Sequence, residues 1–123
     1  MRKPIVAGNW KAHKTSAEAV ALITDLRVQV SGVSGVEVVV CPPFTALAAA
    51  AAALKGSPIG LAAQDVFWEP QGAFTGEVTA PMLIEIGCRY VIVGHSERRQ
   101  FFGEPDQTVN KKLQAALAPQ LTP

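Results

Sequence analysis

The stretch that decides the fold is Val91-Ile92-Val93-Gly94-His95-Ser96-Glu97-Arg98-Arg99, in which β-branched apolar residues lead directly into a charged turn. An apolar run without polar alternation is typical of a strand covered on both faces, as in parallel sheets. A second peptide of this kind, Gly8-Asn9-Trp10-Lys11, follows the apolar run 5–7. We therefore expect chemistry-bearing side chains directly after buried strands.

Four apolar runs predict the strands of the sheet. They cover residues 5–7, 36–41, 59–63 and 90–93. All four lack the alternation of a half-exposed strand, so each is expected to be covered on both faces.

Helical signals separate these runs. Thr15 and Glu18 have the spacing of a capping box and predict a helix whose apolar stripe is Val20, Ile23, Leu26 and Val30. Thr45 is the expected cap of a second helix over residues 46–54, an alanine-rich tract with high helix propensity. A third helix is expected from about 104–106, with Val109, Leu113 and Leu117 as its apolar stripe.

Recurring strand–helix units imply a parallel sheet with right-handed crossovers. Two closures remain open from periodicity alone: an open doubly wound sheet, or half of an eight-stranded barrel. Polar residues follow the strands, with Asn9 and Lys11 after the first, Gln64 after the third and His95 after the fourth. Both architectures build their sites at this edge of the sheet.

Composition limits the classes of partner. The chain has 123 residues, 49% of them hydrophobic and 17% charged, with a formal net charge of +1, which fits one globular domain and favours neither nucleic acid nor a membrane surface as a partner. Cys41 and Cys88 lie far apart in apolar sequence and are interpreted as buried free thiols of a cytoplasmic protein. The N-terminus shows neither a signal peptide nor a membrane span. No metal or cofactor is expected.

Three motifs resemble one known family. They are Gly8-Asn9-Trp10-Lys11, the segment from Ala63 to Glu77 with Gln64 and Thr75, and the peptide from Val93 to Arg99. Their order and spacing are similar to those of triosephosphate isomerase, and the match covers essentially the whole chain. The resemblance implies an α/β fold of the (β/α)8 barrel family. Residues 1–123 would form a (β/α)4 half-barrel of parallel strands, a single unit without an internal domain boundary.

The resemblance also implies a reaction and a set of site residues. The family interconverts dihydroxyacetone phosphate and glyceraldehyde 3-phosphate by proton transfer through an enediol, as in glycolysis and gluconeogenesis. His95 is then a neutral imidazole that donates a hydrogen bond to the reacting oxygen, and Lys11 is a fixed cation facing the substrate, with Asn9 beside it. Glu97 is expected near Lys11, either in proton shuttling or as a structural ion-pair partner. Ser96 is a weaker candidate for substrate binding, or only a helix cap.

The segment from Gln64 to Val78 is too long for an ordinary connection, and its aromatic residues are costly to expose. In the family this loop enters a neighbouring subunit, which implies a homodimer. Thr75, Glu77, Arg98 and Gln64 are the residues expected at this contact. The alternative is a loop folded on its own barrel.

The family's catalytic glutamate lies in the second half of its barrel, so a polypeptide of these 123 residues is expected to be inactive alone. Three interpretations stay open. The chain is part of an isomerase, or a half-barrel module that associates with another copy or a separate second half. The third is an open-sheet binding domain with a weak anion site at Lys11.

Overall fold

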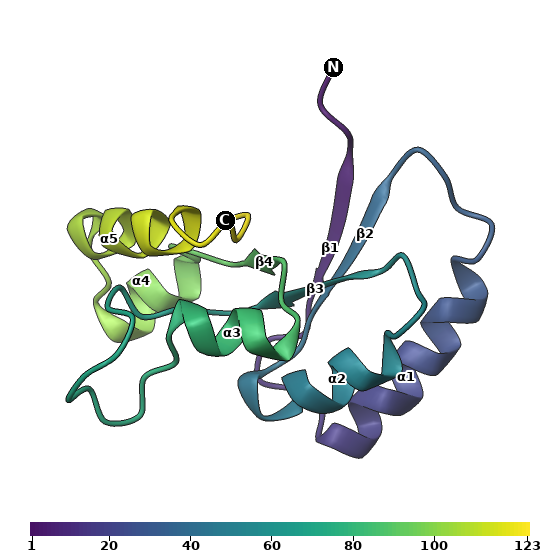
Figure 1. Cartoon of the computed structure of the whole chain (residues 1–123), viewed down its shortest axis with the longest axis horizontal. Coiled ribbons are helices and arrows are strands. Elements are labelled where there is room, and N and C mark those ends of the chain that lie inside the picture. The colour runs from purple at the N-terminus through teal and green to yellow at the C-terminus, as the bar shows by residue number, and fades with distance from the viewer. The chain divides into compact units, whose positions relative to one another are not determined.

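The computed structural model describes all residues from 1 to 123, and the chain divides into two compact units, 1–64 and 65–123. Figure 1 labels the helices and strands of both units. The expectation of a single domain without an internal boundary stays a prediction.

The first unit contains three parallel strands. β1 (Ile5–Asn9) pairs with β2 (Glu37–Cys41), and β2 pairs with β3 (Gly60–Ala63). The register aligns Asn9 with Cys41, so β1 and β2 end side by side. The apolar runs therefore predicted these strands to within one or two residues.

β1 is less covered than its sequence predicts. Ile5 and Val6 are 52% and 61% exposed, whereas Val39 and Val40 of β2 are each only 2% exposed. The prediction that every strand is covered on both faces is wrong for β1. The physical reason is its position at an edge of the sheet, where it pairs with β2 on one side only.

Two helices pack side by side in the first unit, α1 (Ser16–Gln29) and α2 (Leu47–Ala53) (Figure 1). The predicted capping box is confirmed, since Thr15 Oγ1 accepts from the Glu18 N–H and a Glu18 carboxylate oxygen accepts from the Thr15 N–H. The buried face of α1 contains Ala19 and Ile23, while Val20 remains 38% exposed.

The predicted cap of α2 is wrong. A 3-10 helix, η1 (Phe44–Ala46), precedes α2, whose N-cap is Ala46 without a side-chain hydrogen bond. Thr45 lies within η1, and its carbonyl oxygen accepts from Ser16 Oγ at 3.3 Å. Thr45 therefore contributes a link to the start of α1 rather than a cap.

The second unit contains α3 (Ala80–Ile86), β4 (Tyr90–Val91), α4 (Ser96–Phe102) and α5 (Asp106–Leu117) (Figure 1). β4 is shorter than the predicted run 90–93, and its Tyr90 forms a parallel bridge with Thr122. α3 was not predicted, although Thr79, Pro81 and Gly87 mark its ends as N-cap, first-turn proline and left-handed C-cap.

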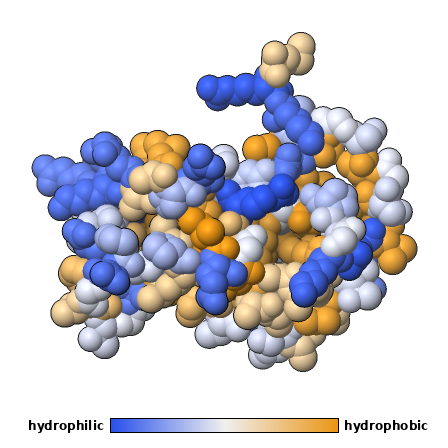
Figure 2. All heavy atoms as spheres, viewed as in Figure 1, coloured by the Kyte–Doolittle hydropathy of each residue, from blue (hydrophilic) through white to orange (hydrophobic).

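α5 buries a different face from the predicted stripe. Leu113 and Leu117 are 37% and 56% exposed, whereas Lys112 and Ala116 are 4% and 0% exposed. Apolar side chains are also exposed elsewhere in both units, and Figure 2 shows apolar residues among polar ones on the face in view. None of the helices has the length and apolar character needed to cross a membrane.

Candidate functional site

Polar side chains of the first unit meet at the carboxyl ends of its strands. Asn9 is the last residue of β1, Cys41 is the last residue of β2, and Gln64 directly follows β3. Gln64 Nε2 donates to the Cys41 carbonyl oxygen at 2.8 Å and to the Lys11 carbonyl oxygen at 2.9 Å. Three strand ends are thereby joined by one amide group.

Lys11 has an unusual backbone conformation at this edge. Its φ of 56° lies in the left-handed region, which costs a non-glycine residue on the order of 1–3 kcal/mol. Asn9 Oδ1 accepts from the Lys11 N–H at 3.0 Å, while Gln64 holds the carbonyl group of the same residue. Both polar groups of the Lys11 main chain are thus fixed by side chains.

Gln64 was predicted at a dimer contact, and the structure gives it a role within its own chain. Its two hydrogen bonds hold the Lys11 turn against the end of β2. A contact with a second subunit stays a prediction. Gln64 therefore supports the main chain around Lys11, a role that the spacing of residues in the sequence did not reveal.

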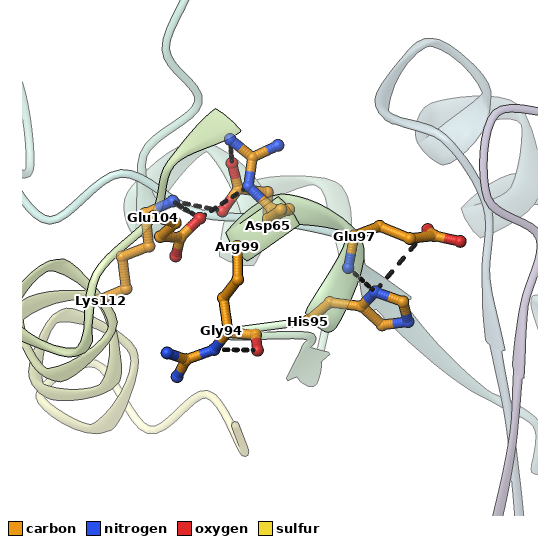
Figure 3. Close-up of polar contacts among 8 residues, drawn as sticks. Asp65, Gly94, His95, Glu97, Arg99, Glu104 and Lys112 are labelled. Carbon is orange, nitrogen blue, oxygen red and sulfur yellow. Dashed lines mark hydrogen bonds and ion pairs between the residues drawn. The ribbon is translucent and has the colours of Figure 1, made fainter. Parts of the chain in front are cut away.

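His95 is the N-cap of α4, and its ring orientation defines which nitrogen carries the proton. Nδ1 accepts from the Glu97 N–H at 3.1 Å (Figure 3). A neutral imidazole that accepts through Nδ1 carries its hydrogen on Nε2. The ring is therefore arranged as a neutral donor, and its side chain remains 29% exposed.

Glu97 also approaches the imidazole, with a carboxylate oxygen 3.7 Å from His95 Nδ1. The same Nδ1 accepts the Glu97 backbone N–H, so Glu97 contacts the imidazole through both its main chain and its side chain. Ser96 is exposed and occupies the first position of α4, so the suggestion that it caps this helix is wrong. His95 has taken the capping position instead.

A partly buried ionic network of the second unit was missed by sequence reasoning. Lys112 Nζ lies 2.8 Å from Asp65 Oδ1 and 3.2 Å from Glu104 Oε2. Arg98 Nε donates to the same Glu104 oxygen at 2.9 Å, and Arg98 Nη2 lies 3.3 Å from Asp65 Oδ2. Figure 3 shows Asp65, Glu104 and Lys112 of this network side by side. Arg98, expected at a partner subunit, thus pairs with two carboxylates of its own chain.

This network had no usable signal in the sequence. Lys112 looks like a solvated charge between apolar positions, and Asp65 lies 47 residues away from it. The side chains of Lys112 and Glu104 are 6% and 4% exposed, which requires that they be paired.

The loop between Gln64 and α3 packs partly on itself. Its ends are joined by a bridge between Phe67 and Thr79, and the Phe67 ring contacts those of Trp68 and Phe74 at centroid distances of 4.1 and 4.5 Å. Thr75 and Glu77 are exposed on this loop, and Phe74 is 40% exposed. Their proposed contact with a second subunit stays a prediction.

Cys41 is 1% exposed, and burial raises the pKa of its thiol to about 11. Cys88 is also a buried free cysteine. A thiol held protonated in this way is a poor nucleophile. The polar groups at this edge of the first unit are therefore the side-chain amides of Asn9 and Gln64 and the Lys11 ammonium group.

Parallel strands that end in polar side chains define an α/β protein of the class that places its chemistry at the carboxyl edge of the sheet. The family model described as "Triosephosphate isomerase" matches residues 4–123. The chain therefore belongs to the triosephosphate isomerase family.

Relatives and a solved structure agree with this assignment. The triosephosphate isomerases of Moorella thermoacetica and Chloroflexus aurantiacus are 63% and 61% identical to the chain over 123 residues, which is 100% of this chain and 49% of each relative. The crystal structure of triosephosphate isomerase from Bartonella henselae matches with a TM-score of 0.91 and 37% identity, covering 98% of this chain and 49% of that one.

These matches confirm the predicted fold class. The chain has the strands and helices of half of a (β/α)8 barrel. It spans about half the length of the curated relatives it matches.

Proposed function

We propose that this chain supplies the Lys11 and His95 side of a triosephosphate isomerase site, which interconverts dihydroxyacetone phosphate and glyceraldehyde 3-phosphate through an enediol. The observation that carries the proposal is the hydrogen bond from the Glu97 N–H to His95 Nδ1. It leaves an Nε2–H donor on a neutral ring, which suits an oxygen that gains negative charge in the transition state.

The other site residues have roles that follow from their chemistry. Lys11 provides a cation for the substrate's oxygens and phosphate, on a main chain that Asn9 and Gln64 hold in place. Asn9 uses its oxygen to hold the turn, so its amide nitrogen is the end that can donate to a ligand. In this proposal Glu97 contributes to proton shuttling and Ser96 contributes to substrate binding.

General-base catalysis needs a carboxylate within hydrogen-bond reach of the carbon-bound proton. The resemblance to the family assigns this base to the second half of the barrel. A polypeptide of these 123 residues is therefore proposed to be inactive alone. The complete site would act in the cytoplasm, as part of a homodimer.

A chimera tests the proposal directly. Residues 1–123 are joined to the half of the Moorella thermoacetica enzyme that they do not match, and isomerase turnover is measured. We expect activity from the chimera and none from the 123-residue polypeptide. His95→Asn should lower kcat by about 100- to 1,000-fold, the range for loss of one such donor.

The choice of variant separates chemistry from helix capping. Asparagine is a good N-cap, so His95→Asn retains a side-chain acceptor for the Glu97 N–H while removing the imidazole donor. Lys11→Met removes the proposed cation and should also lower turnover of the chimera. Lys55→Met is its matched control, because Lys55 is also exposed but lies after α2, outside the site. An active chimera that is unaffected by His95→Asn contradicts the assignment.

Self-association is the second candidate function. Ile5 and Val6 expose apolar surface on an edge strand, which is a template for pairing with another chain. Another copy, or a separate second half, would cover this surface. Sedimentation of the 123-residue polypeptide tests this candidate, and a strictly monomeric species over the accessible concentration range excludes it.

A further inference from the structure

The residue before His95 has no room for a side chain. Gly94 has a φ of +69°, and a Cβ atom built on it would lie 2.8 Å from Val109 Cγ1 and 3.2 Å from Arg99 Nη2. The peptide that leads into His95 is therefore packed between α5 and the Arg99 side chain. Its orientation determines where the chain enters α4.

Arg99 holds this peptide through its side chain and through its own main chain. Arg99 Nε donates to the Gly94 carbonyl oxygen at 3.0 Å, as Figure 3 shows. The Arg99 backbone N–H donates to the His95 carbonyl oxygen at 3.2 Å. The His95 carbonyl oxygen also accepts from the Arg98 N–H at 3.0 Å, so the contact that depends on an arginine side chain is the one to Gly94.

The outer end of Arg99 is tied to α5. Arg99 Nη1 lies 2.6 Å from Asp106 Oδ1, at the first residue of that helix. The two side chains are 40% and 92% exposed, so the ion pair is screened by water and contributes little to stability.

We infer that Arg99 is a positioning residue for His95, acting through the hydrogen bond from its Nε to the Gly94 carbonyl oxygen. The catalytic role of His95 in this inference rests on the proposed function. The positioning of the His95 ring by Arg99 does not depend on that function. By fixing the Gly94 peptide, Arg99 fixes the direction of the His95 Cα–Cβ bond and keeps Nδ1 on the Glu97 N–H. Nε2 then presents its hydrogen in one direction.

Two substitutions separate the carbonyl contact from the ion pair. In Arg99→Gln the amide nitrogen falls at the chain position of Nε, so it can still donate to Gly94 while the charge is lost. In Arg99→Lys a methylene group takes the position of Nε, so the charge can still reach Asp106 while the donor is lost. Gln100→Met is the matched control, at an exposed neighbouring position of α4.

The first measurement is the tautomer of His95, read from the ring nitrogen resonances of the 123-residue chain by NMR. We expect a hydrogen on Nε2 and an acceptor at Nδ1 in the unaltered chain, in Arg99→Gln and in Gln100→Met. Arg99→Lys should show averaging between the two tautomers. This readout does not depend on isomerase activity, so it decides the inference even if the chimera proves inactive.

The second measurement is turnover in the chimera with the Moorella thermoacetica half. Arg99→Lys should lower kcat by about 10- to 100-fold with KM nearly unchanged, since small misplacement of a catalytic group has effects of this size. Arg99→Gln should stay within about fivefold of the parent, the range of an exposed ion pair. Normal behaviour of Arg99→Lys, equal losses in both variants, or failure of both to fold would overturn the inference.

Discussion

Gln64 shows how a single side chain can support a site that it does not enter. Its amide donates to the carbonyl oxygens of Lys11 and Cys41, which lie at or just after the ends of two neighbouring strands. We expect Gln64→Leu to lower the free energy of unfolding by about 1–3 kcal/mol, because the carbonyl oxygens of Lys11 and Cys41 each lose one hydrogen bond. Urea unfolding measures this change. Gln100→Leu, at an exposed position, is the control and should have almost no effect.

Cys41 gives a prediction about pH. Burial raises its pKa from 9.0 to about 11, so the folded state favours the neutral thiol. The stabilisation is fully present below pH 9.0 and is lost as the pH rises toward 11. In this window the free energy of unfolding should fall by about 1.4 kcal/mol per pH unit through this group.

Comparison with Cys41→Ala isolates the contribution of the thiol from other groups that titrate at alkaline pH. The variant is less stable at neutral pH because of the cavity, but its free energy of unfolding should decline less steeply above pH 9.0. Parallel curves for the two proteins would contradict the prediction.

At the scale of elements, the sequence predicted those helix starts and strands that depend on residues close together in the chain. The capping box of Thr15 and Glu18 placed the start of α1, and continuous apolar runs placed the strands. The cap of α2 was mispredicted because the chain enters this helix through η1, where Thr45 is already in a helical turn. Such a prior turn has no distinctive residue pattern.

The error in α5 has a different physical cause. Apolar periodicity predicted that Leu113 and Leu117 are buried, but Lys112 is buried instead, paired with Asp65 from far along the chain and with Glu104 from just before the helix. A pattern along one helix cannot show such partners. The same holds for the candidate site, where the resemblance to the family indicated Lys11 and His95, but nothing in the sequence indicated that Gln64 and Arg99 support them.

The ionic network that joins Asp65, α4 and α5 gives the prediction for this scale. Lys112→Met should lower the free energy of unfolding by about 3–5 kcal/mol, because Glu104 then keeps a buried charge with one cation fewer. Adding Glu104→Leu to this variant should recover part of the loss, since the uncompensated carboxylate is removed. Chemical denaturation of the single and double variants measures both effects, and an additive loss would contradict the explanation.

At the scale of the whole molecule, exposed apolar side chains are combined with a low net charge, which favours association between copies. The formal charge is only +1, so electrostatic repulsion between copies is weak. Val6 is 61% exposed on β1, and Val6→Lys should reduce association of the 123-residue polypeptide by placing a charge on the edge strand. Sedimentation velocity compares the unaltered polypeptide with Val6→Lys. Val28→Lys, at a 74% exposed position of α1, is the control. Equal association of all three proteins would show that β1 is not the contact.

The Lys11 turn also bears on protein engineering. The tripeptide from Asn9 to Lys11 cannot be grafted as a short motif, because its backbone shape depends on an amide that arrives more than fifty positions later. If only the loop is transplanted, Lys11 should return to a negative φ angle, because no amide then holds its carbonyl group. The smallest portable form of this motif is three adjacent strand endings together with Gln64.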